Sequence, residues 1–290
     1  MPASNLFILG SGGPVPTAQR FGSSYAVQLG DEYLLIDCGP ATTYRLARLE
    51  VPLTKIDNLF FTHHHFDHDV DYPCFLLSRW DHSIGQENEL HVFGPPPTTT
   101  ITDRLIGEEG AFAFDWQARV NSPLSHRAFQ LRGGVLPRKP PSVSVKDIGP
   151  GKVTEGKDWQ VTACRAEHVQ PWLESLAYRL DSDAGSIVFT GDTGPCDAIV
   201  EMARGADLMV AMCGGPQHLQ QQDGIDFGQM GTTFAGKLAQ DAGVKKLALA
   251  HIGPRFVAPA RIEAGIIEVS KVFDGEIIYT HEMMKLPLGD

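Results

Sequence analysis

The sequence predicts a mixed α/β fold in which helices come between strands in both halves of the chain. Short apolar runs of strand length alternate with turn residues, and stretches of helical composition separate them. The chain has 30 Gly and 20 Pro among 290 residues, a larger share than globular proteins usually have. We therefore expect many tight turns between the regular elements, and two mixed layers rather than an all-α or all-β protein.

The first sixty residues are predicted to hold four strands and one helix. The strand candidates are apolar runs rich in β-branched and aromatic residues, mostly closed by Gly, Asp or Pro. The helix lies before the fourth strand, where apolar positions are periodic. The strands are expected at residues 6–9, 25–29, 33–36 and 59–62, and the helix at 41–49.

The second half repeats this alternation, and a less regular segment separates the halves. Strands are expected at 159–164, 176–180, 186–190, 208–212, 247–250 and 276–279, with helices at 197–204 and 233–242. The second helix is followed by Gly243, a residue typical of helix ends. Residues 94–151 have weak periodicity and many Gly and Pro residues, so we expect a lid-like insertion within a single domain of residues 1–290.

Composition narrows the classes of function. The chain has 24 Lys and Arg against 35 Asp and Glu, a formal charge of −11, which argues against affinity gained by neutralising a phosphate backbone. We therefore expect a small-molecule substrate rather than a nucleic acid.

No apolar run approaches the ~18 residues of a membrane span, and the first ten residues do not resemble an export signal, so we expect a cytoplasmic protein without a membrane partner. Five scattered cysteines without CxxC spacing predict neither disulfides nor a thiolate metal site.

The segment Thr62-His-His-His-Phe-Asp-His68 is the strongest chemical motif in the chain. His63 and His65 are two residues apart, so in extended backbone both imidazoles face the same side and can bind one cation. Asp67 and His68 follow at the turn and can reach a second cation. A run of surface histidines is the alternative, but this run is internal, contains an acid and comes directly after a predicted strand.

Further candidate ligands follow other predicted strands. His168, Asp192 and His251 each come shortly after an apolar run, as does Asp37. Strand ends of an α/β scaffold meet at a common edge. For each residue taken alone, a core or turn position is the better interpretation, but together with the histidine motif they favour a metal site of imidazole and carboxylate ligands, which suits zinc.

The order of these residues resembles the metallo-β-lactamase superfamily, and within it the branch of ribonuclease Z and its arylsulfatase-like and phosphodiesterase-like relatives. The resemblance includes the start Gly10-Ser-Gly-Gly-Pro-Val-Pro-Thr, the HxHxDH motif, and the segments Phe189-Thr-Gly-Asp-Thr193 and Leu249-Ala-His-Ile-Gly-Pro-Arg-Phe256. It implies an αββα four-layer sandwich and a hydrolase that uses a metal-bridging hydroxide.

The resemblance also implies a role for each residue. One metal would be held by His63, His65 and His168, and a second by Asp67, His68 and His251. Asp192 would bridge the two, and Asp37 would form a hydrogen bond beside the ligands. Asp67 could also orient the hydroxide or accept its proton. The implied cofactor is two Zn²⁺ per chain, with Mn or Fe as alternatives.

Two departures from ribonuclease Z favour a small substrate. The arm that grips transfer RNA in that family does not fit between His168 and Asp192, and Gln229 stands where the family has a histidine that assists the leaving group. His218 could replace that imidazole, or could simply be an exposed histidine. We expect hydrolysis of an aryl sulfate, phosphodiester, carboxylic ester, lactone or activated aromatic ring, by a protein that could be a homodimer.

The sequence leaves alternative functions open. These are a ribonuclease Z-type phosphodiesterase acting on RNA, an iron-dependent redox member of the superfamily, and a non-catalytic ligand-binding member, which the full ligand set disfavours. Phe66 and Trp172 could line a pocket for an apolar or aromatic substrate or could serve in packing. Arg132, Arg138 and Lys139 could attract an anion or form a solvated loop.

Overall fold

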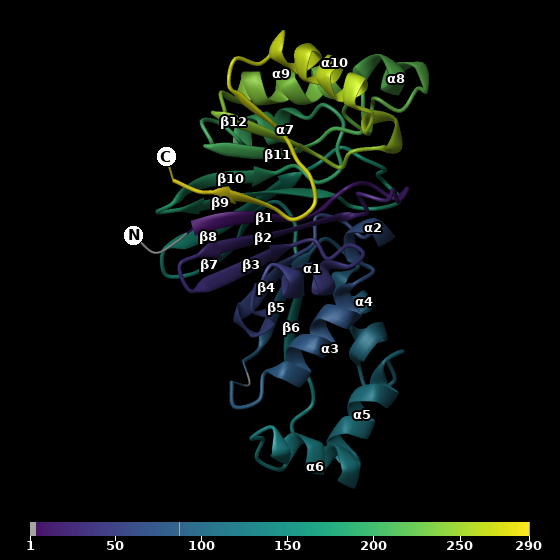
Figure 1. The fold of residues 1–290 in the computed structure, drawn as a ribbon, viewed down its shortest axis with the longest axis vertical. Coiled ribbons are helices and arrows are strands. Elements are labelled where there is room, and N and C mark those ends of the chain that lie inside the picture. The colour runs from purple at the N-terminus through teal and green to yellow at the C-terminus, as the bar shows by residue number, and fades with distance from the viewer. Residues whose placement is uncertain (1–3, 87, 290) are drawn as a thin grey trace.

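The computed structural model describes residues 4–86 and 88–289 as two seven-stranded sheets packed face to face (Figure 1). The strand order is β14-β1-β2-β3-β4-β5-β6 in the first sheet and β13-β12-β11-β10-β9-β8-β7 in the second. The first sheet contains β1 (Ser4–Ser11), β2 (Ser23–Leu29), β3 (Glu32–Ile36), β4 (Ile56–Phe60), β5 (Leu90–Gly94), β6 (Val143–Asp147) and β14 (Met284–Pro287). The second contains β7 (Gly151–Glu155), β8 (Trp159–Arg165), β9 (Leu176–Ser182), β10 (Gly185–Phe189), β11 (Leu208–Met212), β12 (Lys246–Ala250) and β13 (Glu276–Tyr279).

Helices cover the outer face of each sheet. Those near the first sheet are α1 (Thr42–Arg48), α2 (Phe66–Asp69), α3 (Tyr72–His82) and α4 (Thr98–Ile106), with α5 (Ala113–Asn121) and α6 (Pro123–Leu131) farther out. Those near the second sheet are α7 (Asp197–Met202), α8 (Gln217–Gln222), α9 (Thr232–Ala242) and α10 (Pro259–Ser270). Short 3₁₀ turns occur at Leu53–Lys55 and Pro254–Phe256.

Three buried apolar clusters correspond to the three interfaces between the four layers. Leu6 and Leu180 belong to the cluster between the two sheets. Phe75 belongs to the cluster beneath α1 and α3, and Leu238 to the one beneath α7, α9 and α10. The αββα sandwich implied by the sequence resemblance is therefore confirmed.

The central strands are buried on both faces, as their continuous apolar sequences require. All five residues of β11 are buried, and β12 is buried apart from its first residue. The edge strands β6 and β7 have the polar sequences VSVKD and GKVTE and have no fully buried residue, which is why apolar patterning did not predict them. The predicted strands elsewhere in the chain match β1–β4 and β8–β13 within a few residues.

Parallel pairing brings the carboxyl ends of several strands to one end of the sandwich. β3 and β4 are parallel in the first sheet, and β10, β11 and β12 are parallel in the second. A bridge between Gly12 and Ile252 joins the two sheets at this end. The loops that follow β3, β4, β10 and β12 therefore meet there, and they carry Asp37, the histidine motif, Asp192 and His251.

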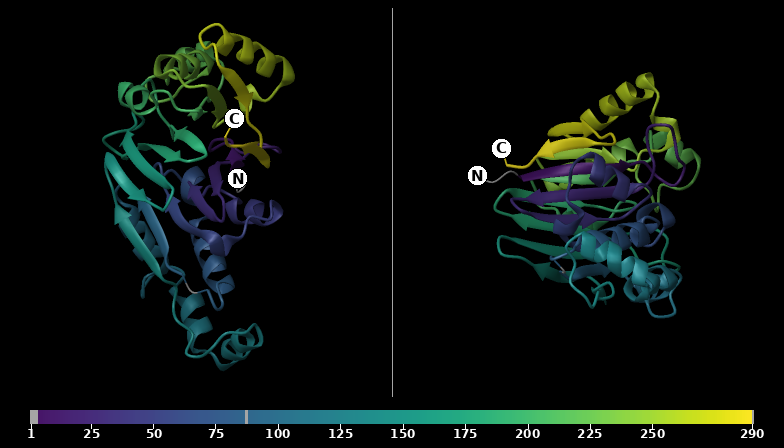
Figure 2. Two further views of the ribbon diagram at one scale, coloured as in Figure 1. Left: turned by 90° about the vertical axis from the view of Figure 1, so that its left-hand side faces the viewer. Right: turned by 60° about the horizontal axis from the view of Figure 1, so that its bottom comes forward.

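Residues 94–151 contribute both to the sandwich and to a projection from it. β6 pairs in parallel with β5, and α4 packs against β6. α5 and α6 extend beyond the layers at the lower end of Figure 1 and project in the same way in the left view of Figure 2. The single domain with a lid-like insertion stays a prediction.

None of the helices in the described part of the chain has the length and apolar character of a membrane span.

Candidate metal centre

The structure gathers seven of the predicted site residues into two adjacent groups of potential ligands. His63, His65, His168 and Asp192 form one group, and Asp67, His68 and His251 form the other; within each, the ligand atoms lie within 4.8 Å of one another. Six of the seven side chains are buried, and only His65 is partly exposed.

Asp192 lies between the two groups. Its Oδ2 is 3.8 Å from Nε2 of His168 and 3.1 Å from Nε2 of His251. Its other oxygen, Oδ1, is 3.4 Å from Nε2 of His68. Within the first group, His65 Nδ1 lies 3.0 Å from His63 Nε2 and 3.3 Å from His168 Nε2. Asp192 therefore has the position that a bridging ligand would need.

Two buried atoms at the centre lack hydrogen-bond partners among the described residues. They are Nε2 of His68 and Oδ1 of Asp192, which face each other. Buried polar atoms are nearly always partnered, and an imidazole nitrogen and a carboxylate oxygen are both ligands for zinc. The residues present therefore fit a bound divalent cation.

Asp37 and Thr62 orient two of these imidazoles. Asp37 accepts hydrogen bonds from the backbone N–H of Thr62 (2.7 Å), the Thr62 hydroxyl (2.9 Å) and Nδ1 of His68 (2.8 Å). Since the one hydroxyl proton of Thr62 is directed to Asp37, its oxygen can accept from Nδ1–H of His63 at 3.1 Å. Both histidines then present Nε2 to the centre, as a hydrogen bond to the far ring nitrogen commonly ensures in metal sites.

His168 is oriented by the backbone of a distant loop. Its Nδ1 lies 2.7 Å from the carbonyl oxygen of Gly228, so the ring donates there and turns Nε2 toward the cluster. Neither this partner nor the orienting role of Thr62 was predicted from the sequence. Thr62 was detectable, because it immediately precedes the histidine motif. The sequence gives no corresponding indication for Gly228, which lies 60 residues beyond His168.

The two histidines of the motif that face mainly other imidazoles are held neutral. Burial and the neighbouring His68 keep the pKa of His63 well below its ordinary value. Burial, followed by the proximity of His168, lowers the pKa of His65. Neutral imidazole is the form that binds a metal.

Attraction between the carboxylates and the imidazoles shifts the pKa values of Asp192 and His68 toward their charged forms. Burial alone would raise the pKa of Asp192, but His251 and His68 outweigh it and hold the pKa well below its ordinary range. In return, Asp37 and Asp192 overcome the effect of burial on His68 and raise its pKa well above its usual value. The cluster thus brings together charged carboxylates and imidazoles, and among the described residues its carboxylates pair with histidines and not with arginine or lysine.

Two site residues have left-handed backbone conformations that are uncommon for residues other than Gly. The φ angle is 57° at Asp37 and 53° at His251. Such strain is typically retained at functional sites, where the surrounding structure enforces it. A Cβ atom on Gly13 would lie 2.7 Å from Cε1 of His251, so the glycine-rich loop after β1 permits the close approach of this histidine.

His218 is the predicted catalytic residue that the structure places apart. It lies on α8 with 67% of its side chain exposed, and its Nδ1 is 3.8 Å from a carboxylate oxygen of Glu268. Within the part of the chain that the structure describes, it forms no hydrogen bond or ion pair with the ligand cluster. Asp37 and Asp67, by contrast, lie within or against the cluster. The catalytic roles of all three stay predictions.

Comparison with known proteins finds similar ribonucleases. Ribonuclease Z from Mycobacterium bovis (strain BCG / Pasteur 1173P2) is 26% identical over 277 residues, 93% of each chain. Ribonuclease Z from Mycolicibacterium gilvum is 29% identical over 204 residues, 70% of this chain and 66% of the relative. The expectation that excludes a nucleic-acid partner is therefore wrong. It relied on the missing arm and on net charge, and net charge is a property of the whole surface that does not determine what a local metal centre accepts.

Solved structures and the family profile agree on the fold. The metallo-beta-lactamase fold protein YhfI from Bacillus subtilis has a TM-score of 0.73 at 24% identity, with 98% of this chain and 99% of that chain covered. The short form of human tRNase Z has a TM-score of 0.70 at 18% identity, with 99% and 100% covered. The profile described as "Metallo-beta-lactamase superfamily" matches residues 17–251. The chain belongs to the metallo-beta-lactamase superfamily and is a hydrolase of that superfamily.

Proposed function

We propose that this hydrolase is a zinc-dependent phosphodiesterase that cleaves a phosphodiester bond in RNA. The observation that supports it best is the paired ligand cluster, whose buried His68 Nε2 and Asp192 Oδ1 lack partners among the described residues. The similarity to proteins named Ribonuclease Z over 93% of both chains favours RNA as the substrate.

In this proposal each ligand group holds one Zn²⁺. His63, His65 and His168 hold the first and Asp67, His68 and His251 the second, with Asp192 shared because it contacts both groups. Two divalent cations, when bound, lower the pKa of a water molecule and stabilise the negative charge that develops on the phosphoryl oxygens. No serine or cysteine nucleophile is then needed.

The chain itself supplies orientation and proton transfer. Asp37 and Thr62 fix the rings of His68 and His63, and Gly228 fixes that of His168. The pKa of Asp67 is lowered because the hydrogen bond from His251 and the charges of His68 and His251 outweigh the effect of burial. Asp67 is therefore ionised at neutral pH and can orient an attacking water or accept its proton.

A second candidate function is hydrolysis of a small ester, such as a small phosphodiester, aryl sulfate or lactone. One observation favours it: β9 and β10 are joined by a tight turn, with Ser182 paired to Gly185. No arm therefore projects between His168 and Asp192. A small activated substrate would also need less help with its leaving group, which suits a site with Gln229 in place of an imidazole.

The test is hydrolysis by the purified protein of a single-stranded RNA labelled at one end. Bis(4-nitrophenyl) phosphate, an aryl sulfate and a lactone are assayed beside it, and metal content is measured on the same sample. We expect RNA cleavage that chelation abolishes and Zn²⁺ restores. Activity indifferent to the chelator would overturn the metal mechanism, whereas hydrolysis of only the small reporters would replace RNA by the second candidate.

His218→Ala tests the remaining candidate for proton donation. Because the imidazole is largely exposed and lies beside Glu268, we expect its removal to change kcat on RNA by less than about 3-fold, where loss of a working general acid typically costs at least ~100-fold. A large fall in kcat, together with loss of the alkaline limb of the pH–rate profile, would instead identify His218 as the donor.

A further inference from the structure

The cluster is accessible mainly beside one ligand. His65 is partly exposed, whereas the other histidine ligands and both carboxylates are each at most 8% exposed. A substrate group that reaches the cations therefore has to approach on the side of His65. The residues around His65 are the ones that meet whatever flanks the reacting group.

Three large aromatic side chains are exposed on the segments that meet there. Phe66 is 53% exposed, Trp172 is 91% exposed and Phe227 is 77% exposed. We call these three residues the aromatic rim. Single exposed apolar residues are ordinary on protein surfaces, but three large aromatic residues on segments that adjoin the candidate ligands favour a binding function.

Contacts of His168 connect the three segments. His168 Nε2 lies 3.3 Å from Nδ1 of His65, the residue before Phe66. Its Nδ1 bonds the carbonyl oxygen of Gly228, the residue after Phe227. Trp172 lies in the turn that follows His168, where its backbone N–H bonds the carbonyl of Val169 at 3.1 Å. Each rim residue is thus attached to a segment fixed against the cluster.

The backbone beneath Phe227 is packed especially closely. A Cβ atom on Gly194 would lie 2.1 Å from the carbonyl oxygen of Phe227, and one on Gly228 would lie 2.5 Å from that of His168. The glycines at 194 and 228 let these loops touch. The Phe227 side chain is therefore held on a fixed backbone while its ring stays exposed, an arrangement that lowers the entropy lost when a flat ligand binds.

We propose that the aromatic rim stacks on unpaired bases that flank the scissile phosphate of a single-stranded RNA. This inference rests on the proposed function. Aromatic side chains bind every base through its π-face, so such a surface accepts many sequences. The cations attract the phosphate while the rim holds the adjoining bases, and the chain needs no long basic groove to position the RNA.

The test measures kcat/KM on a short single-stranded RNA for the Zn²⁺-loaded protein and for Trp172→Ala and Phe227→Ala. Each variant should lose about 5- to 150-fold, the range for one stacked base, mainly through KM. Phe114→Ala is the matched control, because Phe114 is 86% exposed but lies on the projecting α5, outside the rim. Its kcat/KM should equal that of the wild type.

An abasic RNA separates stacking from indirect damage. If Trp172 stacks on a base, removing that base from the substrate should largely abolish the penalty of Trp172→Ala. Quenching of tryptophan fluorescence on titration with the same RNA, in the metal-free protein, should also be weaker in this variant. An equal penalty on intact and abasic RNA, or no penalty on either, would overturn the proposal.

The outcomes distinguish this inference from the proposed function. If the wild type cleaves RNA but both rim variants match it, the rim is wrong and the phosphodiesterase stands. If the wild type hydrolyses none of the phosphodiesters under any metal condition, the proposed function fails, while the fluorescence titration still decides whether the rim binds single-stranded RNA.

Discussion

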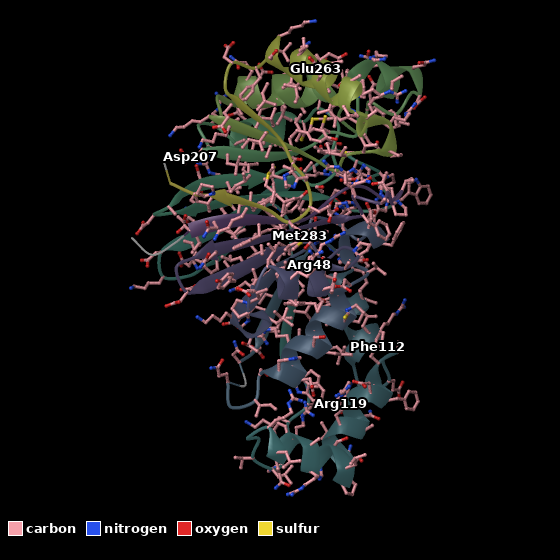
Figure 3. All side chains as sticks on the ribbon, in the orientation of Figure 1. Arg48, Phe112, Arg119, Asp207, Glu263 and Met283 are labelled. Carbon is pink, nitrogen blue, oxygen red and sulfur yellow. The ribbon has the colours of Figure 1, made fainter. Side chains whose placement is uncertain are left out.

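Two clusters of charged side chains in this molecule differ in whether their atoms are already partnered. At the metal centre, three carboxylates lie among five imidazoles, and two buried atoms there have no partner among the described residues. At the base of the projection, the arginine cluster of Arg119, Arg132 and Arg138 surrounds the carboxylate of Asp81, with nearest N–O distances of 3.4, 2.7 and 2.6 Å, and Arg119 also pairs with Asp115 at 2.9 Å. Figure 3 shows blue nitrogen atoms gathered beside the labelled Arg119.

The difference separates a group of residues that could hold a cation from a cluster whose carboxylates are already paired with cationic side chains. Arg138 is buried, and its guanidinium stacks over the rings of Trp80 and Phe129 at 4.1 and 4.8 Å while it bonds Asp81. These contacts join the projecting helices to α3. Arg132 and Arg138, which the sequence offered as a possible anion site, are therefore engaged in structural ion pairs, whereas Nε2 of His68 and Oδ1 of Asp192 lack partners among the described residues.

Asp192→Asn should produce the largest effect, because Asp192 contacts both ligand groups. Loss of its charge should leave less than one tightly bound metal per chain and lower phosphodiesterase activity by about 1,000-fold or more, since bound cations supply several kcal/mol of transition-state stabilisation. Metal content after dialysis and kcat/KM check this. Asp197→Asn, an exposed change of the same type on α7, should change neither. Full metal content in Asp192→Asn would contradict the shared-ligand assignment.

Asp37→Asn should have a smaller and more selective effect. Asp37 bonds Nδ1 of His68 but touches no histidine of the first group. Removing such a partner typically costs 10- to 100-fold in metal affinity, and we expect that loss at one of the two metals only. A zinc titration followed by calorimetry should show one site weakened and one preserved. Equal weakening of both sites would show that Asp37 supports the whole cluster.

Thr62→Val removes the hydroxyl that connects the two groups through Asp37 and His63 while keeping the side-chain shape. We expect about 10-fold weaker metal binding and a shift of His63 toward a mixture of tautomers, visible in the ¹⁵N spectrum of the metal-free protein. Thr62→Ser should restore both. Thr190→Val is the control, since the Thr190 hydroxyl is also buried near the site but bonds only backbone groups. An unchanged His63 spectrum in Thr62→Val would refute the orienting role.

The sequence predicted those elements whose residue polarity matches their burial in the folded chain. Central strands such as β11 read as continuous apolar runs because both of their faces are buried. The polar edge strands β6 and β7 obtain their strand state from pairing with a neighbour, which a local pattern does not contain. α3 went unpredicted, although Tyr72, Phe75, Leu76 and Arg79 are buried at helical spacing, because its buried face includes an arginine.

The candidate ligands were predictable for a related reason. His63, Asp192 and His251 follow parallel strands, and parallel strands bring such positions to one edge. The orienting carbonyl of Gly228 was not predictable, because any residue offers the same backbone oxygen. The rim residue Phe227 was missed for the same reason, since its place beside the site depends on that loop contact.

Asp81→Asn tests the arginine cluster, whose guanidinium groups already have a carboxylate partner. Of the variants considered, it should have the smallest effect, and the effect should be limited to the stability of the fold. Burial raises the pKa of Asp81, but Arg138 and Arg132 outweigh it, so the pKa in the folded chain lies below its ordinary value. The carboxylate therefore stabilises the fold above about pH 4, its unfolded pKa, and this contribution is lost as the pH falls through the lower folded value. With 19% of the side chain exposed, we expect a loss of about 1 kcal/mol at pH 7.

Thermal unfolding of the chelator-treated protein checks this. The Tm of Asp81→Asn should lie about 2 °C below that of the wild type at pH 7, and the difference should shrink as the pH is lowered below 4. Asp241→Asn, an exposed change on α9 outside any cluster, should leave Tm unchanged. Zinc content and RNA cleavage should be the same in all three proteins, because Asp81 stabilises the projection and not the metal centre. A loss of zinc in Asp81→Asn would show that the ligand cluster and the arginine cluster are coupled through α3. The two clusters would then not be independent of each other.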